Sequence, residues 1–411
     1  MSSKWLYHSQ RWYKQQLVVQ RYYMNKDKHI PQGYKNSPLG IIPKEWEVKK
    51  IIDFAPLQRG FDLPTNKIIV GEYPVVYSNG ILNYHNEYKA EGPGVVTGRS
   101  GTIGKVTYVE SNYWPHNTSL WVTDFKGNNP KFVYYIYNHI ELSRFASGSG
   151  VPTLNRNDVH VSKIAIPPTE EQGRIVNVLE LWDTAIEKQS ELIEKLTLRK
   201  RALMQQLLTG KKRLAGFNGK WKHVPIKTFA KEISNKNIGG DNHIVLSCTK
   251  YDGLVPSLEY FGKQIYSNDL SSYKIIPIGH FAYATNHIEE GSIGYQSRYE
   301  YGLISPMYTV FITDKTKVND TFLFAVLKSH HLVYLYKSMM EGSINRRGGL
   351  RWNSFSTIKI DLPPLAEQNA IASVLVKADK EIELAKGKLA SLQSQKRGLM
   401  QQLLTGKKRI K

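Results

Sequence analysis

A ten-residue segment, MQQLLTGKKR, occurs twice in this chain of 411 residues, at 204–213 and again at 400–409. The segment IPPTEEQ at 166–172 has a counterpart, LPPLAEQ, at 362–368, and both pairs are separated by the same 196 residues. Aligned without a gap over 47 positions, from the Pro-Pro pair to the last arginine, the two copies share 24 identities. This period is far longer than the roughly 20–50-residue unit of a repeat array. The pattern therefore indicates a duplicated globular domain with its connecting segment.

Each copy of the connecting segment is predicted to form one long helix. It begins with two prolines, which suit the start of a helix and cannot lie inside one, and acidic residues follow in the first turn, where the helix dipole favours them. It ends at a glycine, Gly210 or Gly406, with basic residues beyond, as is typical of a helix C-terminus. A helix over 170–208 is about 58 Å long at 1.5 Å per residue, which is longer than a small domain is wide.

Both helices carry an apolar seam in steps of four and three residues, which is the heptad pattern of a coiled coil. The seam comprises Ile175, Leu179, Trp182, Ile186, Gln189, Ile193, Leu196, Lys200, Leu203 and Leu207 in the first helix, and Ile371, Leu375, Ala378, Ile382, Ala385, Leu389, Leu392, Lys396, Leu399 and Leu403 in the second. A helix packed on its own domain shows a similar stripe, but the length favours pairing of the two helices. Duplication makes a pseudo-two-fold axis natural, so we predict an antiparallel pair, with Lys200 and Lys396 fixing its register.

Two β-rich segments with little mutual similarity precede the helices. Each begins at a tryptophan, Trp46 or Trp221, contains a short segment between glycines, Gly101–Gly104 or Gly291–Gly294, and closes on a loop with arginine and asparagine. We therefore predict an α+β fold, with two globular domains separated by two long helices that form an antiparallel coiled coil. The predicted boundaries are 1–45 for an N-terminal arm, 46–166 for the first globular domain (the first head), 167–214 for the central helix, 215–362 for the second globular domain (the second head) and 363–411 for the C-terminal helix.

The composition adds a strong positive charge and one cysteine. The chain has 56 Lys and Arg against 35 Asp and Glu, a net charge of +21, which favours a polyanionic partner, with nucleic acid the leading candidate. A single cysteine, Cys248, excludes a disulfide framework and a cysteine-based zinc or iron–sulfur site. No apolar stretch approaches the roughly 18 residues of a membrane span, and the first residues lack the apolar core of a secretory signal. The sequence thus predicts a soluble, cytoplasmic protein.

The positive charge is unevenly distributed. Residues 1–50 carry a net charge of +7, the second head +5 and the C-terminal helix segment +6, whereas residues 51–166 carry only +1. This excess either serves general solubility or places the basic ends of the chain and the repeated Lys-Lys-Arg tails, at 211–213 and 407–409, along a phosphate backbone.

A globular domain ending in Pro-Pro-x-x-Glu-Gln, a long helix ending in QQLLTGKKR, and then both again, resembles the specificity subunit of type I restriction-modification systems. The resemblance extends from about Gly33 to Lys411. It implies two target recognition domains, each reading one half of a bipartite DNA sequence, which is asymmetric because the heads differ. It also implies that the helices form a spacer and dock two methyltransferase subunits. Residues 1–30 match nothing in this family and form a helical arm, a phosphate contact or an extension.

The residues expected to contact DNA lie in the glycine-rich turns and in the loops that close each head. Glycine turns let the backbone approach phosphates, and arginine or asparagine can make bidentate contacts to base edges. The candidates are Arg99, Ser100, Thr102, Lys105, Asn155 and Arg156 in the first head, and Asn286, His287, Ser292, Arg298, Asn345, Arg346, Arg347, Arg351 and Trp352 in the second. Taken singly, each is more often a turn former or a solvated cation; the cluster over 345–352 is the stronger signal because it gathers three arginines and an aromatic residue.

Catalytic motifs are missing or incomplete. GRSGTIGK at 98–105 resembles a phosphate-binding loop, but its spacing is wrong and Val106 stands where Ser or Thr is required. Neither Pro-Pro pair follows the Asn or Asp of an amino-methyltransferase motif, and Glu87-Tyr88-Lys89 lacks the Pro-Asp partner of a nuclease site. The sequence therefore predicts a chain that is not an enzyme and has no metal or cofactor site of its own.

The resemblance places catalysis in partner subunits. It implies S-adenosylmethionine in the methyltransferase subunits, and ATP with Mg²⁺ in restriction subunits that translocate and cleave DNA. Two alternatives remain: a stand-alone nuclease or methyltransferase with an unrecognised site, and a DNA-binding scaffold or RNA-binding protein that works alone.

Overall fold

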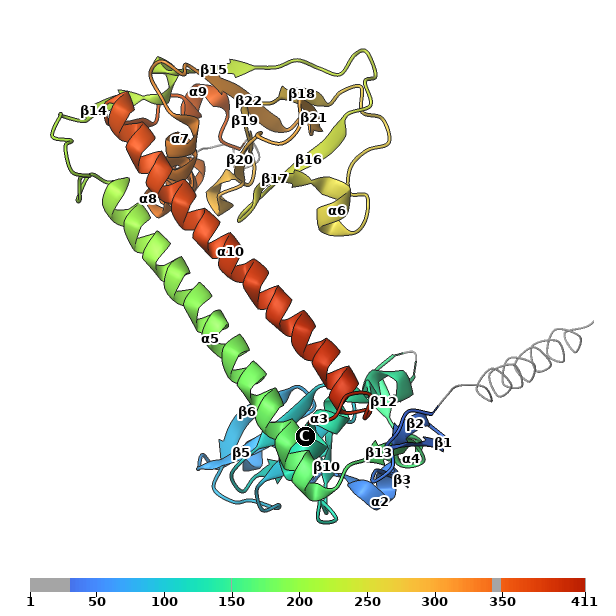
Figure 1. Ribbon diagram of the computed structural model, residues 1–411. Helices are drawn as coiled ribbons and strands as arrows, with labels where there is room; N and C mark the ends of the chain where they lie inside the picture. Colours follow the sequence, from blue (N-terminus) through green and yellow to red (C-terminus); the bar gives the residue numbers. More distant parts are fainter. Residues whose placement is uncertain (1–29, 149, 342–348, 411) are drawn as a thin grey trace, which may run out of the picture. The chain divides into compact units, whose positions relative to one another are not determined.

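The computed structural model describes residues 30–148, 150–341 and 349–410. The chain divides into two units, of which unit 1 comprises the part up to Gln189 together with the part from Lys388, and unit 2 comprises residues 190–387. Each unit therefore holds one head and a stretch of both long helices (Figure 1). Of the predicted N-terminal arm, residues 1–29 lie outside the described part of the chain.

The two long helices, α5 (Thr169–Leu207) and α10 (Leu365–Leu403), have the bounds that the sequence signals predict. Beyond each helix the chain turns at Gly210 or Gly406, whose φ angles of +67° and +70° lie in the left-handed region that glycine tolerates best. The N–H of Lys212 then donates to the carbonyl of Gln206 at 3.1 Å, and the equivalent bond closes the turn after α10. The repeated LLTGKK sequence is thus a helix C-terminus.

Within each unit the two long helices run antiparallel. In unit 1 the ammonium group of Lys396 on α10 pairs with the carboxylate of Asp183 on α5, and in unit 2 Lys200 on α5 pairs with Asp379 on α10. Both the lysines and the aspartates are 196 residues apart, so the two ion pairs are the same contact in the two repeats. The predicted antiparallel pairing is confirmed within each unit, and the lysines that interrupt the seams bind an aspartate of the other helix.

The seam is buried most deeply where the helices meet the heads. Ile175 and Leu179 of α5 are 1% and 0% exposed in unit 1, and Ile371 and Leu375 of α10 are 1% and 3% exposed in unit 2. These side chains join the core of the adjacent head. The start of each helix is therefore held by its own head, whose apolar core extends over it.

Unit 1 builds the first head from short strands and short helices. A four-stranded antiparallel sheet has the order β4-β10-β7-β8, and a three-stranded sheet has the order β6-β5-β9, with β5 and β9 parallel. Its elements are β1 (Tyr34–Ser37), β2 (Gly40–Pro43), β3 (Glu47–Lys50), α2 (Ile51–Phe54), β4 (Leu57–Arg59), η1 (Thr65–Lys67), β5 (Tyr73–Tyr77), β6 (Gly80–His85), β7 (Gly94–Gly98), β8 (Val106–Val109), β9 (Trp114–Pro115), β10 (Ser119–Val122), α3 (Pro130–His139), η2 (Leu142–Phe145), β11 (Ala146–Ser147), β12 (Thr153–Leu154), α4 (Arg156–His160) and β13 (Lys163–Ile166).

Unit 2 builds the second head in the same way. Its two four-stranded sheets have the orders β15-β22-β19-β20 and β17-β16-β21-β18. Its elements are β14 (Lys222–Pro225), η3 (Ile226–Thr228), β15 (Ala230–Ile233), β16 (Ile244–Thr249), β17 (Gly253–Pro256), α6 (Ser257–Phe261), β18 (Lys274–Pro277), β19 (Phe281–Ala284), η4 (Ile288–Glu290), β20 (Ile293–Tyr295), β21 (Tyr301–Ile304), β22 (Tyr308–Thr313), α7 (Asp320–Leu327), α8 (His330–Glu341), α9 (Trp352–Phe355) and β23 (Lys359–Leu362).

The two heads share a framework that their sequences hardly reveal. The sheet β4-β10-β7-β8 corresponds strand by strand to β15-β22-β19-β20, and the pair β3-β13 corresponds to β14-β23. Helix α3 follows β10, and helix α7 follows the corresponding strand β22. The two helices are capped by Asn129 and Asn319, whose side-chain oxygens accept backbone N–H groups of the first turn. The α+β architecture with a duplicated plan is confirmed.

The glycine-bracketed segments that the sequence pairs with each other do not occupy equivalent places. Gly101–Gly104 forms the turn between β7 and β8, with both glycines at positive φ, whereas Ile293 and Gly294 already lie inside β20. Gly294 needs to be a glycine because a Cβ atom there would meet the backbone N of Leu254 at 2.5 Å. Among the described helices, none is long and apolar enough to cross a membrane.

Candidate nucleic-acid interface

In the first head, the end of β7 meets the closing loop. The N–H of Leu154 donates to the carbonyl of Arg99 at 2.7 Å, Ser100 and Thr153 form a β-bridge, and the N–H of Gly101 donates to Pro152 at 3.0 Å. The structure thus brings together two groups of candidate residues, around 99–105 and at 155–156, that lie about 50 residues apart in the sequence.

Arg99 is half-buried and belongs to a polar network that the sequence did not single out. Its Nη1 atom lies 3.5 Å from the carbonyl of Asn117, and the Asn117 amide donates to Asp62. Asp62 also accepts from Arg59 at 3.1 Å. Because Asp62 is separated from Arg99 by 37 positions along the chain, only the pairing of β4, β10 and β7 shows that these side chains are neighbours.

Ser100 is half-buried like Arg99, the other candidates of the first head are exposed, and two of these exposed residues also have structural roles. The ammonium group of Lys105 donates to the carbonyl of Asn79 at 2.5 Å, and the Asn155 side chain accepts the N–H of Asn157 at 3.0 Å as the N-cap of α4. Thr102 and Arg156 are exposed as well. None of these positions is tested for DNA contact, so they stay predictions.

The second head repeats the same backbone contact with different side chains. The N–H of Leu350 donates to the carbonyl of Thr285 at 2.8 Å, and Leu350 is the residue 196 positions after Leu154. Asn286 and Arg351 therefore lie on either side of this contact, and both are exposed. The positions held by Arg99, Ser100 and Asn155 in the first head are held by Thr285, Asn286 and Arg351 in the second.

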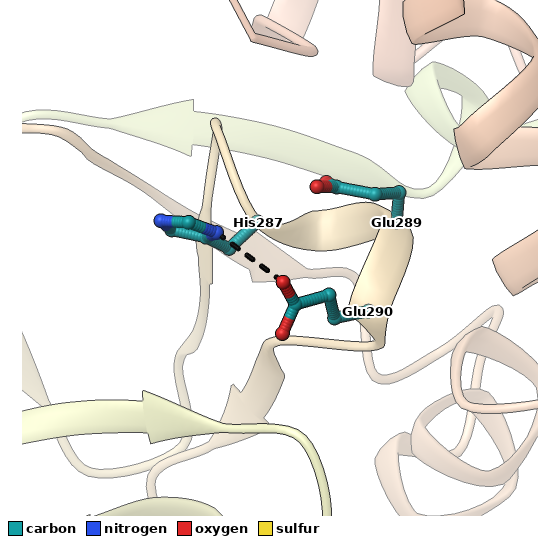
Figure 2. A group of neighbouring side chains, drawn as sticks. All are labelled: His287, Glu289 and Glu290. Atoms are coloured by element: carbon teal, nitrogen blue, oxygen red, sulfur yellow. Dashed lines mark ion pairs between the residues drawn. The ribbon is translucent and has the colours of Figure 1, made fainter.

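His287 lies beside two carboxylates (Figure 2). Its Nδ1 atom is 3.6 Å from Glu290 Oε1. One possible metal-ligand atom from each of His287, Glu289 and Glu290 lies within 4.8 Å of the other two. In the described part of the chain this is the one cluster of three such side chains that could hold a metal ion. Two carboxylates also make the surroundings of His287 unfavourable for a phosphate group.

Three further candidates of the second head are described by the structure and have different surroundings, and three more are not described. Ser292 is only 6% exposed, so its hydroxyl group does not face solvent. The ring of Trp352 packs 5.4 Å from that of Phe311 and 5.9 Å from that of Phe355, which makes it largely a core residue. Arg298 is exposed in the turn after β20. Asn345, Arg346 and Arg347 lie outside the described residues.

The arginines of the two basic tails are bound to buried glutamates. Arg409 donates to both carboxylate oxygens of Glu171, at 3.1 and 2.8 Å, and Arg213 does the same to Glu367, with both bonds at 2.5 Å. The interpretation of these tails as phosphate contacts is therefore wrong for the arginines. It stays open for the adjacent lysines, which are exposed.

A tryptophan completes each of these junctions. The indole N–H of Trp46 donates to Glu171, and that of Trp221 to Glu367, both at 3.1 Å. Glu171 and Glu367 are 1% and 0% exposed. The sequence contained a signal for this role, since the Glu and the Arg belong to the repeated segments and a tryptophan opens each head.

The cysteine does not act as a nucleophile in this setting. Its sulfur donates to the carbonyl of Ala282 at 3.2 Å, and burial raises the pKa of Cys248 to about 12. At neutral pH the thiol is therefore protonated, whereas thiol catalysis requires the thiolate.

Comparison with known proteins identifies both heads. Residues 43–198 and 227–394 each match the model of the type I restriction modification DNA specificity domain. The chain is 26% identical to a putative type I restriction enzyme MjaX specificity subunit of Methanocaldococcus jannaschii, over 92% of this chain and 97% of that protein. It is also 26% identical to the MjaVIII specificity subunit of the same organism, over 66% and 68% of the two chains.

Solved structures share the fold. The crystal structure of the S subunit of a type I restriction-modification system from M. genitalium superposes with a TM-score of 0.55 at 14% identity, over 92% of this chain and 98% of that one. A structure concerned with complex assembly and conformational transition of the type I R-M system has the same TM-score and identity, over 89% and 99%. With both heads matched by the domain model and both followed by the same helix junction, the chain belongs to the type I restriction-modification DNA specificity family.

Proposed function

We propose that this chain is the sequence-reading subunit of a type I restriction-modification complex. Each head binds one half of a bipartite DNA target, and α5 and α10 set the spacing between the half-sites and dock two methyltransferase subunits. The chain itself carries out no catalysis. It works in the cytoplasm, where such a complex meets the DNA of the cell.

One observation carries this proposal: both heads present a loop at the same backbone contact, but with different side chains. Leu154 meets Arg99 in the first head as Leu350 meets Thr285 in the second. Side chains that differ at equivalent positions offer different donors and acceptors to base edges. Two such heads read two different half-sites, and the target is therefore asymmetric.

Catalysis belongs to the partners in this proposal. The methyltransferase subunits use S-adenosylmethionine, and restriction subunits use ATP and Mg²⁺. The names of the Methanocaldococcus relatives, which are specificity subunits of restriction enzymes, support this division of labour.

Exchange of one head tests the modular part of the proposal. Residues 215–362 are replaced by the second head of another member of the family, and the methylated sequence is determined in cells that also contain the methyltransferase. We expect one half of the target to change and the other to stay the same. Changes in both halves contradict separate reading by the two heads.

Single substitutions test the loop. Arg99→Ala and Arg351→Ala are expected to weaken binding of the matching DNA by about 1–3 kcal/mol if each arginine contacts a base, and to relax selectivity at one position only. Arg174→Ala is the control, because Arg174 is a helix-surface residue paired with Glu170 at 2.8 Å. A uniform loss across all DNA sequences assigns the arginine to a phosphate instead.

The purified chain distinguishes the proposal from a stand-alone enzyme. We expect salt-sensitive binding to DNA without methyl transfer from S-adenosylmethionine and without cleavage in the presence of ATP and Mg²⁺. Turnover by the chain alone, at a rate that follows its concentration through purification, refutes the proposal.

A further inference from the structure

A cavity of about 260 Å³ lies beside the first head, within unit 1. Its wall is largely apolar: Ile42 comes from β2, Ile140 follows α3, and Leu404 follows α10. These side chains are 2%, 7% and 3% exposed and belong to the core of unit 1. The cavity is several times the roughly 30 Å³ share of one water molecule, and it has room for one large apolar side chain.

The rim of this cavity is cationic. Lys163 and Arg144 line it, and Lys50 lies directly opposite Lys163 in the antiparallel pair β3-β13. Like charges at directly opposite positions destabilise a sheet, and for these three cations no ion pair with a carboxylate is found among the described residues. His139 also lines the cavity, but burial lowers its pKa and leaves it neutral at pH 7.

The equivalent strand pair in unit 2 keeps only one of the two opposing lysines. Lys359, the residue 196 positions after Lys163, lies opposite Pro225, and two positions along the same strand pair Asp361 lies opposite His223 and is bound to it at 2.8 Å. The two opposing lysines are therefore not a by-product of the duplicated framework. Of the strand pairs β3-β13 and β14-β23, only the first places two lysines opposite each other.

The combination of an apolar wall and a cationic rim selects the chemistry of the occupant. DNA phosphates can pair with the cations but offer no apolar group for the cavity. The N-terminal segment of this chain, up to residue 29, carries six basic residues and one acidic residue, the same sign of charge as the rim. An acidic peptide with a large apolar side chain satisfies both parts.

We propose that this cavity docks an acidic peptide segment of a partner protein. A Phe, Leu or Met side chain of that segment fills the cavity, while carboxylates on either side of it pair with Lys50, Lys163 and Arg144. The proposal goes beyond DNA reading and does not depend on it.

A synthetic peptide with one Phe flanked by Asp and Glu residues serves as the probe, and fluorescence anisotropy with the full chain at low salt measures its affinity. We expect Lys163→Glu to weaken binding at least about tenfold, or 1.4 kcal/mol, through charge reversal. Thr405→Phe is expected to weaken it as much by filling the cavity, without a change of charge. The controls are the equivalent substitutions in unit 2, Lys359→Glu and Thr209→Phe, which should leave the affinity unchanged.

Four outcomes overturn the proposal. The first is no binding of the probe, and the second is equal binding of a peptide in which Ser replaces Phe. The third is competition by duplex DNA together with a loss of DNA affinity in Lys163→Glu, which assigns the surface to DNA. The fourth is binding only after deletion of residues 1–29, which makes the N-terminal segment the occupant.

Discussion

The first and second heads are joined to the long helices in the same way, but their neighbouring contacts differ. In unit 1 a buried glutamate, Glu171, binds Arg409 and Trp46, and in unit 2 Glu367 binds Arg213 and Trp221. These bonds are equivalent in geometry as well as in sequence position. The junction is thus the part of the duplicated plan that has changed least.

The helix that packs beside the junction differs between the heads. On α3, Lys131 pairs with Glu180 at 3.2 Å, and the Tyr135 hydroxyl donates to Asp183 at 2.6 Å. Counted from the capping asparagine, the corresponding residues of α7 are Thr321 and Ala325. The first head therefore has polar contacts to the long helices that the second head lacks, although both heads share one framework.

The largest expected effect concerns the common junction. Glu171→Ala and Glu367→Ala each remove a buried carboxylate and leave an arginine and an indole N–H without their acceptor, at a cost of about 3 kcal/mol in the free energy of unfolding. Urea denaturation measures this cost. Glu170→Ala, at an exposed neighbouring position, should change it by less than about 0.5 kcal/mol. If Glu171→Ala and Glu367→Ala differ greatly in their cost to the free energy of unfolding, the two junctions are not equivalent.

The closing loops give the next effect. Gly349 has a φ of +61°, and a Cβ atom there would lie 2.4 Å from the carbonyl of Thr285. Gly349→Thr is therefore expected to cost about 1–3 kcal/mol and to open the Leu350–Thr285 hydrogen bond, which amide hydrogen exchange detects. At the equivalent position the first head already has Thr153, so Thr153→Gly should cost no more than about 1 kcal/mol. Similar costs for both substitutions contradict this account.

The contacts that are specific to the first head give a smaller effect. Tyr135→Phe removes one hydrogen bond to a partly exposed carboxylate and is expected to cost about 1 kcal/mol. Lys396→Met should cost more than Lys200→Met, because the Lys396 side chain is 14% exposed and its ammonium group lies 5.2 Å from the centre of the Tyr135 ring. Thermal unfolding of the three variants ranks their losses of stability. Equal losses for Lys396→Met and Lys200→Met would contradict the proposed difference between the units.

The smallest effect concerns pH. The N–H of Leu57 donates to Nε2 of His160 at 2.9 Å, and burial lowers the pKa of His160 below 6.5. Because the folded-state pKa is lower than that of the unfolded chain, this residue's contribution to stability is present above pH 6.5 and is lost as the pH falls below it. The second head has Ser356 at this position. His160→Gln should therefore reduce the acid sensitivity of unit 1 only, as thermal unfolding at neutral and mildly acidic pH measures.

The sequence predicts the helices and their pairing because these depend on local periodicity and on the repeat. The stops at Gly210 and Gly406, the seam and the lysines within it are all visible in single segments. The junction is different, because Arg409 is 238 positions from Glu171 and its partner can be recognised only after the helices are paired.

The candidate interface shows a similar limit. Arg99 and Asn155 were predicted from loop composition, and the structure brings their loops together. Ser292 has the same local composition as an exposed turn residue, but its segment enters a strand of the sheet and is buried. Whether a polar side chain next to a glycine faces solvent depends on strand pairing, which composition does not contain.

In each junction the glutamate lies on one long helix and the arginine follows the other, so the two junctions form in a fixed order as the chain is synthesised. In the second head Arg213 is translated before its partner Glu367. In the first head the glutamate comes first, because Glu171 is translated 238 residues before Arg409. At about 5–20 residues per second, Glu171 waits roughly 12–50 s for the guanidinium group that completes its junction. Arg213 and Glu367 are both translated before Arg409, so the junction of the first head is completed after that of the second head.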